Sequence, residues 1–220
     1  MKTANPKMPE ENMAIAEQFE DASQQREAAH LGMWVFIATE VLFFGGLFLA
    51  YVVYRHFYFH AFALGSSRTD LFYGTLNSVI LLTSSFTMAL AVQSAKRNQA
   101  RVIQRFLHLT ILLGASFLVV KGFEYHKDIA DQLVPGTNFN RSLPVQSQVF
   151  FWLYWTMTGL HAVHIFVGLN ILTVMTLLAR RGRFSSQYCT PVEITGLYWH
   201  FVDIVWLFLY PLLYLIDRHT

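Results

Sequence analysis

Acidic and histidine side chains recur inside long apolar stretches of this 220-residue sequence, where ionisable groups are costly. A charged side chain near the middle of a bilayer costs at least about 2.5–3.5 kcal/mol on insertion scales, so such residues usually face protein or water and often mark function. Glu40 is the clearest case, because no other charged residue lies within two helical turns of it. It serves either as a proton-linked or lipid-contacting group, or as a neutral acid hydrogen-bonded to a neighbouring helix.

Two further pairs have a spacing that places both members on one helical face. His161 and His164 are three residues apart, and so are His200 and Asp203. Two imidazoles so placed can chelate a metal. No cysteine or carboxylate ligand lies nearby in the sequence, so hydrogen bonding between helices is the better interpretation and no metal site is predicted. For His200 and Asp203 we expect a structural histidine–carboxylate pair, although such a pair can also hold a proton.

Glu124 lies near the end of another apolar stretch, one turn after Lys121. The residues there form either a solvated helix end or a buried contact in which Glu124 meets His161 or His200 of another helix. The sequence leaves both alternatives open.

These side chains are carried by five stretches long enough to cross a membrane, which takes roughly 20 mainly apolar residues. They are Leu31–Tyr54, Leu71–Ala95, Phe106–His126, Gln148–Ala179 and Ile194–Ile216. The composition agrees, since 54% of the residues are hydrophobic and 14% are charged, against about 25% charged in soluble domains. We therefore predict an all-α, polytopic membrane protein, with turns at Gly65-Ser66-Ser67, Pro135-Gly136 and Arg181-Gly182.

Residues 1–29 are polar and acidic and are predicted to form a cytoplasmic tail, which includes a helical turn near Met13–Phe19, before a transmembrane domain at 30–220. Lysine and arginine are enriched in cytoplasmic loops. One side of the predicted bundle has Lys2, Lys7, Arg26, Lys96, Arg97, Arg101, Arg105, Arg180, Arg181 and Arg183, and the other has Arg55, Arg68, Lys121, Lys127, Arg141 and Arg218. This bias predicts a cytoplasmic N-terminus. The net charge of +2 gives no indication of a nucleic-acid partner, and the single cysteine, Cys189, excludes an intrachain disulfide.

Four motifs, in this order along the chain, resemble the subunit III family of haem-copper terminal oxidases. They are Thr39–Phe44, Glu124-Tyr125, Gly159–His164 and Tyr198–Tyr210. Ala162 stands in the third motif where the family commonly has glycine, and the fourth motif is highly specific. The resemblance covers roughly Leu31 to Ile216. The long form of the family has seven helices, and this chain resembles the short bacterial form that lacks the first two.

The resemblance implies a V-shaped bundle of five helices that binds phospholipid in its cleft and packs against the catalytic subunit I. It implies that haem and copper belong to partner subunits, that subunit II and small subunits join the complex, and that the location is the bacterial inner membrane. No catalytic residue is implied for this chain. Glu40 maps to the buried carboxylate of the lipid cleft and proton-uptake side. Buried polar helix contacts are expected at Glu124, His161, His164, His200 and Asp203.

The implied function is an accessory one, which supports proton uptake and the lifetime of subunit I during aerobic electron transport. Thr39–Val41 and Trp206–Tyr210 resemble the cytochrome c oxidases more than the quinol oxidases. Three alternatives stay open. They are subunit III of a quinol oxidase, the related five-helix protein that accompanies nitric oxide reductases, and a proton-coupled transporter that uses Glu40, Glu124 and Asp203. The chain has no internal repeat, which counts against the transporter.

Overall fold

The structure is a computed structural model that describes residues 19–181 and 189–216. These residues form only helices and their connections, and five of the helices are long and apolar enough to cross a membrane. The helices are α1 (Ala22–Phe57), α2 (Phe59–Arg68), α3 (Leu71–Lys96), α4 (Ala100–Ala130), α5 (Ser147–Arg180) and α6 (Thr190–Tyr214). The prediction of an all-α protein with five membrane-crossing helices is confirmed.

The first long helix begins earlier than its apolar stretch suggests. Helix α1 starts at Ala22 rather than at Leu31. Its N-cap is Asp21, whose carboxylate accepts a hydrogen bond of 2.7 Å from the backbone N–H of Gln24. The last third of the predicted polar tail is therefore helical, because a local cap and not hydropathy decides where this helix starts. The helical turn predicted at Met13–Phe19 lies almost wholly outside the described residues.

A short helix that the sequence interpretation missed fills the connection between the first two spans. The predicted turn at Gly65-Ser66-Ser67 is wrong, since these residues lie inside α2. A Cβ atom on Gly65 would lie 2.5 Å from Cδ1 of the Phe150 ring on α5, so glycine here permits close helix packing. The hydroxyl of Ser66 also donates to the carbonyl of Leu213 in the last turn of α6, at 3.1 Å. Tertiary contacts thus hold a segment too short to be stable alone.

Helix α6 lies at the centre of the bundle and is the most buried of the five long helices. Its large side chains pack against glycines of its neighbours. A Cβ atom on Gly114 of α4 or on Gly168 of α5 would come within 2.8 Å of the Trp199 ring. The indole N–H of Trp199 donates to the hydroxyl of Ser84 at 3.1 Å, and that of Trp206 donates to Ser78 at 3.0 Å. Small residues and buried indole hydrogen bonds are the usual means by which membrane helices associate.

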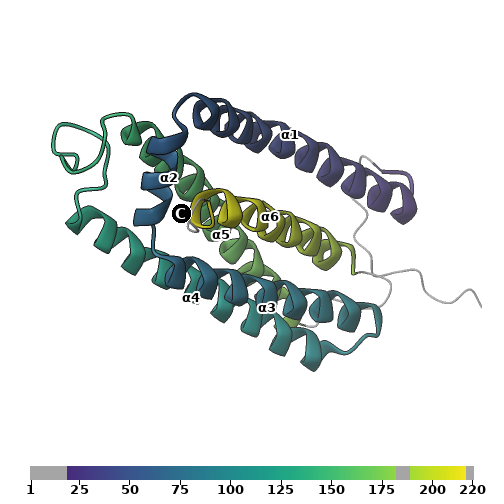
Figure 1. The fold of residues 1–220 in the computed structure, drawn as a ribbon. Coiled ribbons are helices and arrows are strands. Elements are labelled where there is room, and N and C mark those ends of the chain that lie inside the picture. Colours follow the sequence, from purple (N-terminus) through teal and green to yellow (C-terminus); the bar gives the residue numbers. More distant parts are fainter. Residues whose placement is uncertain (1–18, 182–188, 217–220) are drawn as a thin grey trace, which may run out of the picture.

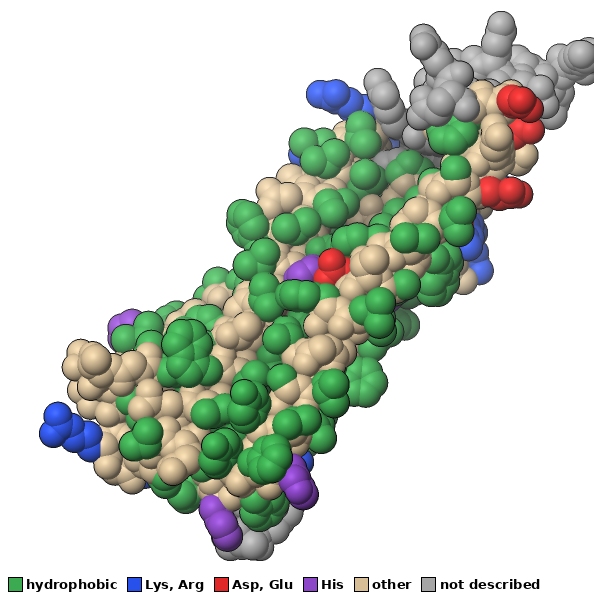
Figure 2. Space-filling view, turned by 90° about the horizontal axis from the view of Figure 1, so that it is seen from above, with side chains coloured by type: hydrophobic (Ala, Val, Ile, Leu, Met, Phe, Trp, Pro, Cys, Tyr) green, Lys and Arg blue, Asp and Glu red, His purple; other side chains and the backbone are tan. Residues whose placement is uncertain are grey.

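Helix α1 and the α3–α4 pair lie on opposite sides of α5 and α6 (Figure 1). The described part of α1 contacts α2, α5 and α6, and it does not approach α3 or α4 closely. Successive long helices alternate in direction, so α1 begins and α6 ends at opposite ends of the bundle (Figure 1). Hydrophobic side chains cover the middle of the face in Figure 2, and most acidic and basic side chains gather toward the two ends.

Candidate functional site

The isolated glutamate of α1 faces a groove between α1, α5 and α6. Nε2 of His164 lies 3.2 Å from a carboxylate oxygen of Glu40, and both side chains are less than one-fifth exposed. The groove has a volume of about 420 Å³ and is otherwise apolar. Its lining residues are Met33, Phe36, Glu40, Val163, His164, Val167, Ile171 and Tyr198. Glu40 of α1 is thus paired with a histidine of α5.

The hydrogen bonds of His164 determine how many protons the pair holds. Its Nδ1 lies 2.9 Å from the carbonyl of Leu160 one turn earlier, so Nδ1 carries a hydrogen and donates to that carbonyl. The short contact between Nε2 and Glu40 then needs one proton, which belongs either to the carboxyl or to the imidazole. The Glu40 carboxyl and Nε2 of His164 therefore face each other inside an otherwise apolar groove.

His161 lies in a different environment from His164, although the two were predicted to share a face. His161 is fully buried, and neither ring nitrogen has a hydrogen-bond partner among the described residues. Its ring packs against Phe117 and Trp206, with ring centroids 5.4 and 5.1 Å away. His161 thus lacks the predicted interhelical hydrogen bond among the described residues, whereas His164 contacts Glu40 of α1 at 3.2 Å. Residues three apart differ in direction around the helix axis. This difference is enough to place His161 in the core and to turn His164 toward α1.

His200 and Asp203 do not form the predicted pair. Nδ1 of His200 lies 2.8 Å from the hydroxyl of Ser85 on α3. Asp203 is 4% exposed, and its two carboxyl oxygens have no hydrogen-bond partner within the described part of the chain. An unpaired buried carboxyl costs free energy unless a water or another subunit satisfies it. His200 therefore links α6 to α3 through Ser85, and Asp203 is a buried carboxyl near the same serine.

Glu124 meets neither histidine that the sequence suggested, because it belongs to a separate buried network. The Lys121 ammonium lies 3.0 Å from Glu124 and donates to the hydroxyls of Tyr154 and Tyr214 at 3.1 and 2.6 Å. Those two hydroxyls in turn contact a Glu124 oxygen at 2.8 and 2.6 Å. The ammonium thus has one ion-pair partner and two hydrogen-bond acceptors, supplied by α4, α5 and α6. The network sits beside α2 and the C-terminal end of α6, away from the groove of Glu40.

A proton count shows how this network can be neutral. The Tyr154 hydroxyl accepts from Lys121 and lies 2.8 Å from both Glu124 and Asp128. A phenol has one hydrogen, so one of its two carboxyl contacts needs a hydrogen from the carboxyl itself. Tyr214 also donates to Glu124, and the remaining hydrogen belongs to either Glu124 or Asp128. One ammonium and one carboxylate then cancel, as burial in a membrane requires.

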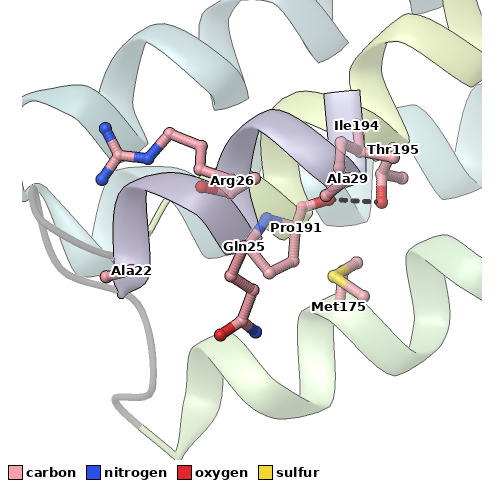
Figure 3. A pocket seen from close by; sticks show the side chains of 9 residues that line it. Ala22, Gln25, Arg26, Ala29, Met175, Pro191, Ile194 and Thr195 are labelled. Atoms are coloured by element: carbon pink, nitrogen blue, oxygen red, sulfur yellow. Dashed lines mark hydrogen bonds between the residues drawn. The ribbon is translucent and has the colours of Figure 1, made fainter. Parts of the chain in front are cut away.

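A second cavity continues the groove of Glu40 toward the end of the bundle where α1 begins. Its volume is about 290 Å³, and Figure 3 shows its lining from the first turns of α1, from Met175 of α5 and from the start of α6. Ala29 and Met175 lie one helical turn from the groove residues Met33 and Ile171 on their respective helices. The two cavities therefore follow one interface, from the helix ends to Glu40.

One polar contact at this end of the bundle was not predicted from the sequence. Glu193 of α6 lies 3.1 Å from the Lys96 ammonium of α3 and 3.5 Å from the His30 ring of α1. It joins three helices that are distant in sequence, and only the bundle brings them together. Among the described residues, no group of three or more histidine, cysteine, aspartate or glutamate side chains is placed to bind a metal.

These features define a polytopic helical membrane protein with a groove beside Glu40 and with buried polar groups that mainly join helices. A model of the family described as Cytochrome c oxidase subunit III matches residues 16–217. The chain belongs to this family, as its four motifs indicated.

Individual relatives agree with the family match. The chain is 31% identical over 209 residues to cytochrome c oxidase subunit 3 of Thermostichus vulcanus, which covers 94% of this chain and 97% of the relative. It is also 31% identical over 205 residues to cytochrome c oxidase subunit 3 of Corynebacterium diphtheriae. This match covers 89% of this chain and 95% of the relative. A relative from Aeropyrum pernix named heme-copper oxidase subunit I+III is 32% identical over 190 residues, which are 84% of this chain and 22% of that protein.

Proposed function

We propose that this chain is the non-redox subunit III of a proton-pumping haem-copper oxidase that takes electrons from cytochrome c and reduces O₂. Membership of the subunit III family and near full-length similarity to proteins named cytochrome c oxidase subunit 3 support this role. The relative named subunit I+III supports a position beside subunit I, since its name joins the two. Haem and copper belong to subunits I and II in this proposal, and small subunits complete the complex.

The proposed location is the bacterial inner membrane, with the N-terminus in the cytoplasm. The end of the bundle where α1 begins also holds the α3–α4 and α5–α6 connections. The basic residues at or beside these connections are Lys96, Arg97, Arg101, Arg105, Arg180 and Arg181. The opposite end carries Arg55, Arg68, Lys127 and Arg141. The larger positive charge is expected on the cytoplasmic side.

The two neighbouring cavities along α1 support the binding of a phospholipid. From Ala22 to Glu40 the groove follows 18 residues of helix, or roughly 27 Å at about 1.5 Å per residue. That length begins at the helix ends and reaches the middle of the α1 apolar stretch. An acyl chain in the groove would keep water away from Glu40 and His164.

The single observation that carries the functional role is the Glu40–His164 contact at the inner end of this groove. In this proposal Glu40 of α1 and His164 of α5 share a proton. The position of that proton then depends on how α1 packs against α5. We propose that this pair supports proton uptake by subunit I and that losing it shortens the active life of the oxidase.

Replacement of Glu40 by glutamine tests this role. The amide of Gln has an N–H that can donate to Nε2 of His164, so the helices keep their contact while the exchangeable proton is lost. We expect the complex carrying Glu40→Gln to assemble and to start at a rate close to that of the wild type, and then to lose activity after fewer turnovers. The measurement is oxygen consumption followed until activity is lost, with subunit content determined in parallel.

Thr39→Ala is the matched control, because Thr39 is adjacent and exposed and its hydroxyl donates to Phe36 of the same helix. It should leave both the starting rate and the lifetime unchanged. A Glu40→Gln complex that fails to assemble would show a purely structural role. An assembled complex with an unchanged lifetime would also contradict the proposal.

A further inference from the structure

Three arginines from two helices line a cavity on a different side of the bundle from the Glu40 groove. Arg101 and Arg105 lie in the first turns of α4, and Arg180 is the last residue of α5. Together with Gln104 and His108 they line a cavity of about 440 Å³. We call Arg101, Arg105 and Arg180 the arginine cluster. All three side chains are exposed, and nothing in the proposed role of subunit III uses them.

Hydrogen bonds hold one arginine of the cluster in place. Nδ1 of His108 lies 2.6 Å from the carbonyl of Gln104, so this nitrogen carries the hydrogen and donates. Nε2 of the same ring lies 2.8 Å from the Arg180 guanidinium, which can only donate. His108 must therefore be neutral and accept from Arg180. Gln104 also donates to the carbonyl of Ala179 at 3.1 Å, which fixes the end of α5 against α4.

The cluster lacks a counter-charge in the described part of the chain. None of its three guanidinium groups forms an ion pair with a described carboxylate. The first turn of α4 contains no acidic residue, so Arg101 and Arg105 lie at the positive end of the α4 dipole, where cations are unfavourable. Arg180 lies at the negative end of the α5 dipole, so the unfavourable positions are those of Arg101 and Arg105. Three cations in one cavity with no described carboxylate favour an external anion as their partner.

The surroundings indicate which anion this is. The cavity lies at the boundary between the charged helix ends and the apolar middle of α4 and α5. Toward the middle, the two helices expose Leu109, Leu112, Val174 and Leu177. Basic pockets between membrane helices are a recurring form of binding site for anionic lipid headgroups. Guanidinium groups also suit phosphate because their paired N–H groups match its oxygens.

We propose that the arginine cluster binds the phosphate of an anionic phospholipid whose acyl chains lie against the exposed apolar side chains of α4 and α5. This site is separate from the groove of α1. It does not depend on Glu40 or on the electron donor of the oxidase.

The test is native mass spectrometry of the full-length chain in mild detergent, with phosphatidylglycerol and phosphatidylcholine of identical acyl chains as probes. The wild type should retain one phosphatidylglycerol in clear preference to phosphatidylcholine. The variant Arg105→Gln/Arg180→Gln should lose most of that preference. Each basic residue near an anionic membrane surface contributes about 1 kcal/mol, so removing two should weaken binding about 30-fold. Raising the ionic strength should weaken the wild type in the same direction.

Arg97→Gln/Arg181→Gln is the matched control, because it removes the same charge from exposed positions at the same end of the bundle but outside the cavity. It should retain the preference. His108→Ala, which removes the acceptor that holds Arg180, should give an intermediate loss. Equal losses in the two double variants would mean that surface charge alone attracts the lipid, and would overturn the proposal.

Two further measurements test whether the arginine cluster instead binds free phosphate or an acidic protein surface. Inorganic phosphate that displaces phosphatidylglycerol at equal concentration would show a site for the free ion and contradict a lipid site. Loss of the Arg105→Gln/Arg180→Gln chain from the oxidase complex, even with saturating phosphatidylglycerol, would show that the cluster binds an acidic protein surface. Retention of the variant chain in the complex supports the lipid proposal.

Discussion

At the scale of single residues, Lys121 makes the most constrained set of contacts in the described chain. Its side chain is 2% exposed, and its ammonium lies within 3.1 Å of Glu124, Tyr154 and Tyr214. It also faces the rings of Tyr154 and Trp206, at 4.7 and 5.6 Å from their centres. Cation–π contacts of this kind strengthen when the cation is removed from water. Three helices thus depend on one buried positive charge.

Replacement of Lys121 by methionine should therefore be strongly destabilising. It leaves the Glu124 carboxylate buried without its cation, and breaking a buried pair in this way costs about 3–5 kcal/mol. The measurement is the free energy of unfolding of the detergent-solubilised chain. The double variant Lys121→Met/Glu124→Gln removes both charges and should recover most of the loss. A double variant less stable than Lys121→Met alone would contradict the assignment of Lys121 and Glu124 as one charge pair.

At the scale of helices, glycines divide into those that set interhelical distances and those that do not. Gly114 of α4 and Gly168 of α5 face Trp199, whose ring is held by its hydrogen bond to Ser84. On the same two helices, a Cβ atom added to Gly122 or Gly159 would have no described atom within 4 Å, apart from the neighbouring backbone of its own helix. The four positions look alike in sequence, and the packing of α6 distinguishes them.

Alanine substitutions at these four glycines should have opposite effects. Gly114→Ala and Gly168→Ala force the Trp199 ring or the helices to move, and overpacking of this kind costs about 1–3 kcal/mol. Gly122→Ala and Gly159→Ala meet open space and gain helix propensity, worth up to about 1 kcal/mol. Thermal unfolding midpoints of the four variants in one detergent test this. Equal destabilisation at all four positions would mean that α4 and α5 do not approach α6 as described.

At the scale of the whole molecule, five crossings place the start of α1 and the end of α6 on opposite sides of the membrane. Burial and the nearby Glu193 raise the pKa of the Cys189 thiol, so the native cysteine should react slowly, and Cys189→Ser removes it altogether. In that background, Arg141→Cys should react with a membrane-impermeant maleimide in spheroplasts. Arg97→Cys should react only after the membrane is permeabilised. The reversed pattern would place the N-terminus outside the cell.

Much of this architecture could be predicted from the sequence because it rests on local physics. A bilayer requires long apolar helices whatever their neighbours are, so the spans beginning near Leu71 and Gln148 were located to within one residue. The short helix α2 and the early start of α1 were missed, since the first depends on packing against α5 and α6 and the second on a single capping side chain. Motif order identified the family, because the four motifs combine specific residue types with fixed positions along the helices.

The partners of the polar residues were decided by the tertiary structure alone. Sequence spacing puts His161 near His164 and His200 near Asp203, yet each of these side chains has a different environment. Rotation about a helix axis and the choice of neighbouring helix decide which interface a side chain enters, and neither is recorded in spacing. By itself, the sequence determined that ionisable groups lie inside the membrane and that the chain resembles subunit III. Only the packing of α1, α4, α5 and α6 decided that Glu40 pairs with His164 and that Lys121 lies between Glu124, Tyr154 and Tyr214.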